Sequence, residues 1–173
     1  TGIRRQRQMC IRDRLNTKRD LNPFSLFEND KPFTEANFEG KWDLVFLGFA
    51  SCPDMCPMTM QKMAKAAQML SQKEGLIEKI NFVMISIDPD RDSPERVNEY
   101  AKAFNKEFKG VSGNIKDIYQ LSLNLTLPFT PVIDSKNTDY DMDHSMNLAL
   151  IDPSGKYHGC LLYTSDAADE CLC

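Results

Sequence analysis

The sequence predicts an α/β fold in which a central mixed β-sheet carries helices on both faces. Two apolar runs of strand length, 43–49 and 80–87, lack polar alternation, as expected of strands buried on both faces. Each run is followed by a segment with apolar residues at helical spacing. A third helical segment and a further strand come later, so the order of elements favours a sheet covered on both sides.

The composition limits the classes of protein to which the chain can belong. The chain has 173 residues with 42% hydrophobic and 27% charged residues, which is typical of one soluble globular domain. No apolar run approaches the roughly 20 residues of a membrane-spanning helix. The formal net charge of −4 argues against nucleic acid as a main partner. We expect a monomer.

The two ends differ in composition from the middle. Residues 1–14 carry five Arg, and residues 160–173 carry three of the six Cys, without a period that continues into the neighbouring sequence. We interpret both as non-native flanks and place the domain at residues 22–159. An Arg-rich N-terminus is also typical of a transit-peptide remnant. If the flanks are non-native, four cysteines have no role, namely Cys10, Cys160, Cys171 and Cys173.

The first half of the domain contains a hairpin, a strand and a helix. Short alternating segments on either side of Asn29-Asp30 predict a β-hairpin. The apolar strand at 43–49 follows. The segment 58–72 has its apolar residues on one helical face, and Gly75 is a plausible stop.

The second half of the domain contains a strand, two helices and a further strand. After the strand at 80–87, Ser93 is a candidate N-cap with Pro94 at the first helical position. A shorter helix is expected at 115–123 with Asn114 as its cap. A strand at 146–151 and the start of another at 156 complete the pattern. We interpret Asp88 and Asp92, between strand and helix, as turn and capping residues.

Two cysteines stand where the first buried strand gives way to a helix. If Cys56 lies in the first turn of that helix, Cys52 lies at its mouth and both sulfurs can face the same way. A helix N-terminus favours thiolates, so we expect lowered thiol pKa values. The pair can then form a disulfide or bind a soft metal. The alternative is a structural pair of buried cysteines.

His144 is the best candidate for a third metal ligand. It stands where a long loop, 127–143, meets a strand, and loops at strand ends converge in this type of fold. Two thiolates and one imidazole suit Cu(I), accept Cu(II), and hold zinc if water or Asp completes the set. We expect the loop to become ordered when metal binds. Met55 and Met58 flank the cysteines, whereas Met60 and Met63 fall on the apolar stripe.

Four motifs carry a family resemblance. They are Phe49-Ala50-Ser51-Cys52-Pro53-Asp54-Met55-Cys56-Pro57, Ile85-Ser86-Ile87-Asp88-Pro89-Asp90-Arg91-Asp92, Tyr140-Asp141-Met142-Asp143-His144-Ser145 and Ile151-Asp152-Pro153-Ser154-Gly155. Together they resemble the Sco (SenC) family of copper chaperones, over roughly residues 22–159. The Cys-Pro-Asp-x-Cys-Pro and Asp-His-Ser motifs fall in the family's order.

The resemblance implies both a fold and a function. It implies a thioredoxin-like fold, copper bound by Cys52, Cys56 and His144, and a role in assembling the CuA site of cytochrome c oxidase. The implied partners are the CuA subunit and other copper chaperones. The implied place is the mitochondrial inner membrane facing the intermembrane space, or the bacterial periplasm and inner membrane. Family members carry an N-terminal anchor and a C-terminal helix, which this sequence does not match.

Two enzyme classes compete with a chaperone. A thiol-disulfide oxidoreductase would use Cys52 and Cys56 as its redox pair, although thioredoxins themselves use Cys-x-x-Cys. A peroxiredoxin-like peroxidase needs Thr three residues before its cysteine, where this chain has Phe49 and Pro53. The extra residue between the cysteines and the presence of His144 favour metal binding.

Overall fold

Eight strands form one mixed sheet in the computed structural model, which describes residues 13–131 and 142–161. The strand order is β1-β8-β7-β4-β5-β6-β2-β3. β4, β5 and β6 are parallel to one another, whereas β7 runs antiparallel to β4. The strands are β1 (Asp13–Arg19), β2 (Leu26–Glu28), β3 (Lys31–Phe33), β4 (Trp42–Gly48), β5 (Ile80–Ser86), β6 (Lys109–Gly113), β7 (Leu148–Ile151) and β8 (Tyr157–Leu161).

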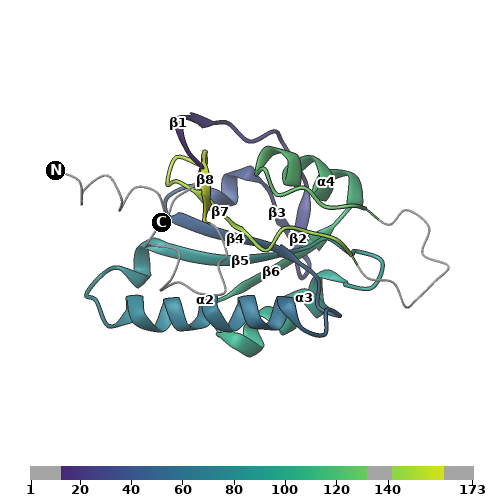
Figure 1. Ribbon diagram of the computed structural model, residues 1–173, viewed down its shortest axis with the longest axis horizontal. Helices are drawn as coiled ribbons and strands as arrows, with labels where there is room; N and C mark the ends of the chain where they lie inside the picture. The colour runs from purple at the N-terminus through teal and green to yellow at the C-terminus, as the bar shows by residue number, and fades with distance from the viewer. Residues whose placement is uncertain (1–12, 132–141, 162–173) are drawn as a thin grey trace, which may run out of the picture.

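Helices cover both faces of the sheet, as predicted (Figure 1). α2 and α3 lie along one face, and α4 lies on the other. The helices are α2 (Met55–Ser71), α3 (Pro94–Phe104) and α4 (Ile115–Asn124), with short 3₁₀ turns η1 (Glu35–Phe38) and η2 (Ile77–Lys79). The predicted α/β class and two-sided covering are therefore confirmed. The expected lack of a C-terminal helix concerns residues 162–173, which lie outside the described part of the chain.

Local sequence signals placed most elements correctly. Ser93 caps α3 by accepting a hydrogen bond from the Arg96 N–H, and Asn114 caps α4 through the Lys116 N–H. The hairpin of β2 and β3 turns at Asn29, whose φ of 55° suits Asn better than most residues. α2 begins at Met55, three residues before the predicted start, so Cys56 does lie in its first turn.

Strand β6 was not predicted. Its sequence Lys-Gly-Val-Ser-Gly has one large apolar residue, so it lacks the apolar run that marks the other central strands. Gly110 explains part of that composition. A Cβ at this position would lie 2.2 Å from the Val97 carbonyl oxygen, so only glycine lets α3 pack this closely on β6. The close approach of the α3 backbone therefore determines the composition of this strand, and an apolar side-chain pattern does not mark it.

The sheet extends beyond the expected domain boundaries of 22 and 159. β1 pairs antiparallel with β8, with Asp13 opposite Cys160 and Arg14 opposite Gly159. Cys160, which we had assigned no role, is buried at 5% exposure. Residues on both sides of the expected boundaries thus pair within the sheet, through backbone groups that composition does not reveal. That the rest of residues 1–14 and 160–173 is non-native stays a prediction.

No helix within residues 13–131 and 142–161 is both long enough and apolar enough to cross a membrane. The centre of the loop predicted to order on metal binding, residues 132–141, lies outside the described residues.

Candidate metal centre

The candidate site lies where the parallel strands β4 and β5 end. β4 ends at Gly48, and the chain turns through Phe49–Asp54 into α2. A Cβ on Gly48 would lie 2.6 Å from a ring carbon of Phe46 and 3.1 Å from the Cys56 sulfur. Glycine at this position therefore lets the sulfur of Cys56 lie directly against the end of the strand. In parallel sheets this edge is where ligand sites usually form.

The two cysteines differ in exposure. Both are free thiols, but Cys56 is fully buried whereas Cys52 is partly exposed. Burial raises the pKa of the Cys56 thiol well above its usual range, and the nearby Cys52 and Asp92 add to the rise, while a backbone hydrogen bond at Phe49 opposes it. Our expectation of a lowered pKa for this thiol was wrong, because desolvation outweighs the helix N-terminus.

His144 lies against Cys56. Its Nε2 is 3.5 Å from the Cys56 Sγ, although 88 residues separate the two in sequence. The rings of Phe46 and Phe49 hold the imidazole from two sides, with centroid distances of 6.1 and 5.7 Å. His144 also forms an isolated antiparallel bridge with Phe129. The structure thus brings together two residues that the fold class predicted would converge.

A buried aspartate fixes the loop that carries Cys52. Asp92 is fully buried, and its Oδ2 accepts 2.7 Å hydrogen bonds from the Ala50 N–H and the Ser86 hydroxyl. Its other oxygen lies 3.4 Å from Nε of Arg96, and that side chain also donates to the Ser51 hydroxyl. The sequence predicted Asp92 to be a turn or capping residue. The sequence could not show these contacts because they join the residue to the loop 42 positions earlier.

The loop between β5 and α3, which carries Asp92, also contacts the aromatic side chains beside His144. Arg91 pairs with Asp88, and its guanidinium carbon lies 5.5 Å from the centre of the Phe49 ring. Phe49 is therefore in contact with a cation on one side and with His144 on another. The prediction that Asp88 is a turn residue agrees with its short-range partners, Arg91 and the Ser86 hydroxyl.

The spacing of sulfur and nitrogen suits a shared metal ion. Bonds of about 2.3 Å to sulfur and 2.0 Å to nitrogen at a tetrahedral angle place the two ligand atoms about 3.5 Å apart. Cys56 and His144 already have this separation. In the described residues, no three His, Cys, Asp or Glu side chains are arranged so that they could already hold a metal together. Cys52 would therefore need to reorient to complete a set of three ligands.

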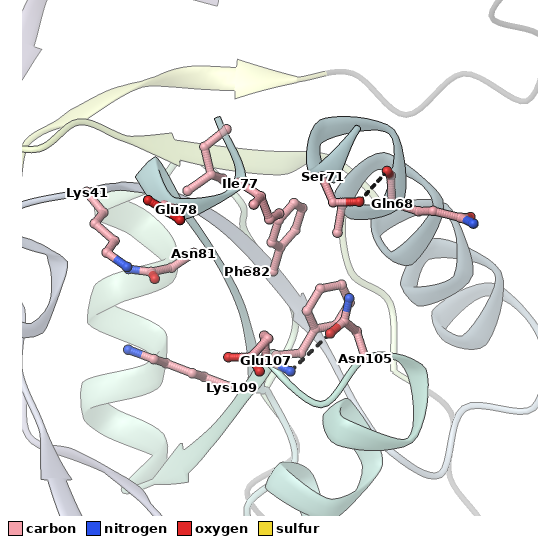
Figure 2. A pocket seen from close by; sticks show the side chains of 13 residues that line it. Lys41, Gln68, Ser71, Ile77, Glu78, Asn81, Phe82, Asn105, Glu107 and Lys109 are labelled. Carbon is pink, nitrogen blue, oxygen red and sulfur yellow. Dashed lines mark hydrogen bonds between the residues drawn. The ribbon is translucent and has the colours of Figure 1, made fainter. Parts of the chain in front are cut away.

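A hollow at the opposite end of the sheet contains none of the predicted ligands (Figure 2). Its volume is about 720 Å³, and it lies between the ends of α2 and α3 and the first residues of β5. Phe82 and Phe108 form an apolar part of its wall, with Lys41, Asn81 and Lys109 at one side. His158 also belongs to this end, where it stacks edge-on against Trp42 at the start of β4.

The sequence matches a known protein family over most of its length. The model of the SCO1/SenC family matches residues 12–171, which is most of the chain. The chain belongs to the SCO1/SenC family. The match includes the two cysteines and His144 as well as the strands β1 and β8. Family membership therefore agrees with a sheet that extends past the expected boundaries.

Curated relatives from eukaryotes and bacteria resemble the chain. The mitochondrial protein SCO2 of Saccharomyces cerevisiae is 36% identical over 137 residues, covering 78% of this chain and 45% of the yeast protein. A SCO2-like protein of Rickettsia conorii is 35% identical over 133 residues, covering 75% of this chain and 62% of its own length. The chain spans about half the length of the curated relatives it matches.

Solved structures of Sco proteins share the fold. Yeast Sco1 with copper bound matches with a TM-score of 0.75 at 30% identity, covering 88% of this chain and 84% of that one. Arabidopsis thaliana ScoI with copper bound matches with a TM-score of 0.72 at 31% identity, covering 84% and 88%. The predicted thioredoxin-like fold and the predicted family are confirmed.

Proposed function

We propose that this protein binds one copper ion through Cys52, Cys56 and His144, and that it delivers the ion to the CuA site of cytochrome c oxidase. The observation that carries the proposal is the 3.5 Å separation between the Cys56 sulfur and the His144 nitrogen. That separation matches two ligands of one tetrahedral ion.

The ligand chemistry supports copper over other metals. Two thiols and one imidazole form a soft set that suits Cu(I) and tolerates Cu(II). Binding would release the thiol protons, and the raised pKa of Cys56 means that this release depends on the metal itself. Relatives with about 30% identity have been solved with copper bound, which is consistent with the same cargo here.

A chaperone must release its cargo as well as bind it. In this site one thiol, Cys52, is partly exposed, so a partner's ligand can reach the metal and replace Cys52 first. Cys56 and His144 would leave afterwards, and the copper would move by ligand exchange without a free ion. The family implies the CuA subunit and other copper chaperones as partners, in a mitochondrial intermembrane space or a bacterial periplasm.

The experiment is an anaerobic Cu(I) titration of the reduced protein and of His144→Ala. We expect one Cu(I) per chain in the wild type and at least tenfold weaker binding in the variant, since one of three ligands is lost. His158→Ala is the matched control, because His158 packs on Trp42 at the other end of β4. Equal affinity of the wild type and His144→Ala would contradict the proposed ligand set.

A second function has one observation in its favour. Cys52 is partly exposed while Cys56 is buried, which is how an attacking and a resolving thiol are arranged. The Cys52 thiolate would attack a partner's disulfide, and Cys56 would then displace the partner's thiol. The partner gains two electrons as the Cys52–Cys56 disulfide forms. If His144→Ala retains full Cu(I) affinity but loses this exchange with a disulfide-bonded partner, the protein is a reductase.

A further inference from the structure

One side of α3 faces the beginning of α2, where the cysteines lie. Arg96, in the first turn of α3, donates a 3.1 Å hydrogen bond to the hydroxyl of Ser51, the residue before Cys52. Phe104, the last residue of α3, lines a hollow between α3 and α2. Residues four apart on a helix lie on the same side, so Tyr100 lies between these two side chains. Tyr100 therefore faces the first turns of α2.

The hydroxyl of Tyr100 is directed toward the two thiols. Its ring packs edge-on against Phe104, with 5.2 Å between the ring centroids. Aromatic side chains on helices lean toward the N-terminus of the helix, which in α3 lies at the cysteine end of the parallel strands. Burial raises the pKa of the hydroxyl, and charge on Cys56, Cys52 and Asp92 adds to the rise. The hydroxyl therefore keeps its proton and lies within electrostatic range of both sulfurs.

Within the part of the chain that the structure describes, this hydroxyl has no hydrogen-bond partner. The oxygen itself is buried, although the Tyr100 side chain is partly exposed. The contrast is Tyr157, at the other end of the sheet, whose hydroxyl lies 2.6 Å from the Thr126 hydroxyl. Buried polar groups in folded proteins are almost always hydrogen-bonded, and an exception beside a functional site calls for a functional reason. A donor that has no acceptor in the thiol form can gain one when the thiols lose their protons.

Copper binding would supply that acceptor. Two thiolates and a neutral imidazole leave one net negative charge with Cu(I) and none with Cu(II), in a site where Cys56 is fully buried. The backbone of Phe49 already forms one hydrogen bond to Cys56. Hydrogen bonds to a charged acceptor are stronger than those between neutral groups. A second donor beside the sulfurs would therefore stabilise the thiolates, and it would stabilise the Cu(I) form more than the Cu(II) form.

We propose that Tyr100 donates a hydrogen bond to one thiolate of the Cys52–Cys56 pair when copper is bound, and that this bond favours Cu(I) over Cu(II). The proposal rests on the function proposed above. Tyr100 is a positioning residue, since it acts through a sulfur ligand and does not bind the ion. The bond forms as the cysteine side chains reorient around the ion, and neither the proton of the hydroxyl nor an electron is transferred.

The test is Tyr100→Phe, which removes only the hydroxyl. In an anaerobic competition with bicinchoninate we expect a Cu(I) affinity at least threefold below that of the wild type, and a smaller loss of Cu(II) affinity. The free energy of unfolding of the reduced, metal-free protein should not fall, because the hydroxyl makes no hydrogen bond to the described residues in the thiol form. Tyr157→Phe is the matched control, since it loses a bonded hydroxyl and should be less stable yet bind Cu(I) as the wild type does.

Two spectroscopic measurements separate a bond to sulfur from a general effect of the substitution. A thiolate that loses a hydrogen bond is a stronger electron donor, so the thiolate-to-Cu(II) charge-transfer band should move to lower energy in Tyr100→Phe and stay in place in Tyr157→Phe. In the wild type, the carbon-13 signal of the Tyr100 ring carbon that bears the hydroxyl should shift on Cu(I) binding, whereas that of Tyr157 should not. The second measurement needs no variant of the site.

The outcomes separate this proposal from the copper function. If the wild type binds Cu(I) and Tyr100→Phe binds it equally tightly, Tyr100 has no such role and the copper function stands. If Tyr100→Phe binds more weakly but neither the charge-transfer band nor the Tyr100 carbon signal moves, the effect is structural and the proposal is again wrong. If the wild type takes up no Cu(I) at all, both proposals fail.

Discussion

Two buried aspartates lie at opposite ends of the parallel strands, and their surroundings differ. Asp92, at the cysteine end, accepts hydrogen bonds from Ala50 and Ser86 and faces Arg96. Asp43, near the start of β4, is 1% exposed, and neither of its carboxylate oxygens has a hydrogen-bond partner of good geometry among the described residues. The first carboxylate holds a loop in place, whereas the second is buried at a cost.

The raised pKa of Asp43 reflects the free-energy cost of burying its carboxylate. Burial raises its pKa from 3.8 to about 6, while the approach of Asn81 and the charges of Lys109 and Lys41 oppose the rise. The comparison teaches that the sheet tolerates a poorly paired carboxylate at the end away from the cysteines. At the cysteine end the carboxylate is better paired, since one oxygen of Asp92 accepts two hydrogen bonds and the other lies 3.4 Å from Nε of Arg96 without a hydrogen bond of good geometry.

The largest expected effect comes from Asp92→Ala. Removing the carboxylate leaves the Ala50 N–H and the Ser86 hydroxyl without their acceptor, which should lower the free energy of unfolding by about 3 kcal/mol. Cu(I) affinity should fall as well, because the loop before Cys52 loses its anchor. Urea denaturation and Cu(I) titration measure both. Asp90→Ala, which removes an exposed carboxylate from the same loop, is the control. An equal loss of stability and of Cu(I) affinity in that variant would show that the buried contacts of Asp92 are not the cause.

A smaller effect of opposite sign is expected from Asp43→Asn. Because the folded pKa is raised, the wild type gains stability from this group below about pH 4 and loses it as the pH rises through about 6. The variant lacks this loss and should be about 2 kcal/mol more stable than the wild type at pH 7.5, with a smaller difference at pH 4. Urea denaturation at both pH values measures it. A difference independent of pH would mean that the wild-type carboxylate is well solvated or well paired.

The smallest effect is expected from Arg96→Ala. The side chain is 56% exposed, so its ion pair with Asp92 should contribute only about 0.5 kcal/mol to stability. Lys102→Ala on the same helix is the control for loss of an exposed positive charge. Thermal denaturation of both variants at low and moderate salt measures the difference. A loss above about 2 kcal/mol would show that Arg96, rather than the backbone hydrogen bond of Ala50, anchors the loop.

Local signals explain which elements could be predicted. Ser93 with Pro94, and Asn114, are caps whose effect lies within one turn, and both helices start where these residues indicated. The strands β4 and β5 were equally clear because burial on both faces leaves a run of large apolar residues at the centre of each. Such signals need only neighbouring residues, so a single sequence contains them.

Long-range contacts explain what could not be predicted. β6 depends on how closely Gly110 lets α3 approach, and β1 depends on backbone pairing with the far end of the chain. The motif order suggested that His144 approaches the cysteines, but not which sulfur it meets or that Phe46 and Phe49 hold its ring. The pKa of Cys56 was predicted in the wrong direction because its depth depends on the packing around Gly48.

The pairing of β1 with β8 has a consequence for synthesis. β1 is among the first described segments to leave the ribosome, yet its partner strand leaves among the last. During translation β1 therefore has no strand to pair with while β4, β5 and β6 already can assemble. Contacts between such distant segments form slowly and late in folding. A pulse-labelling experiment on nascent chains of increasing length should find backbone amides of β4 and β5 protected before those of β1.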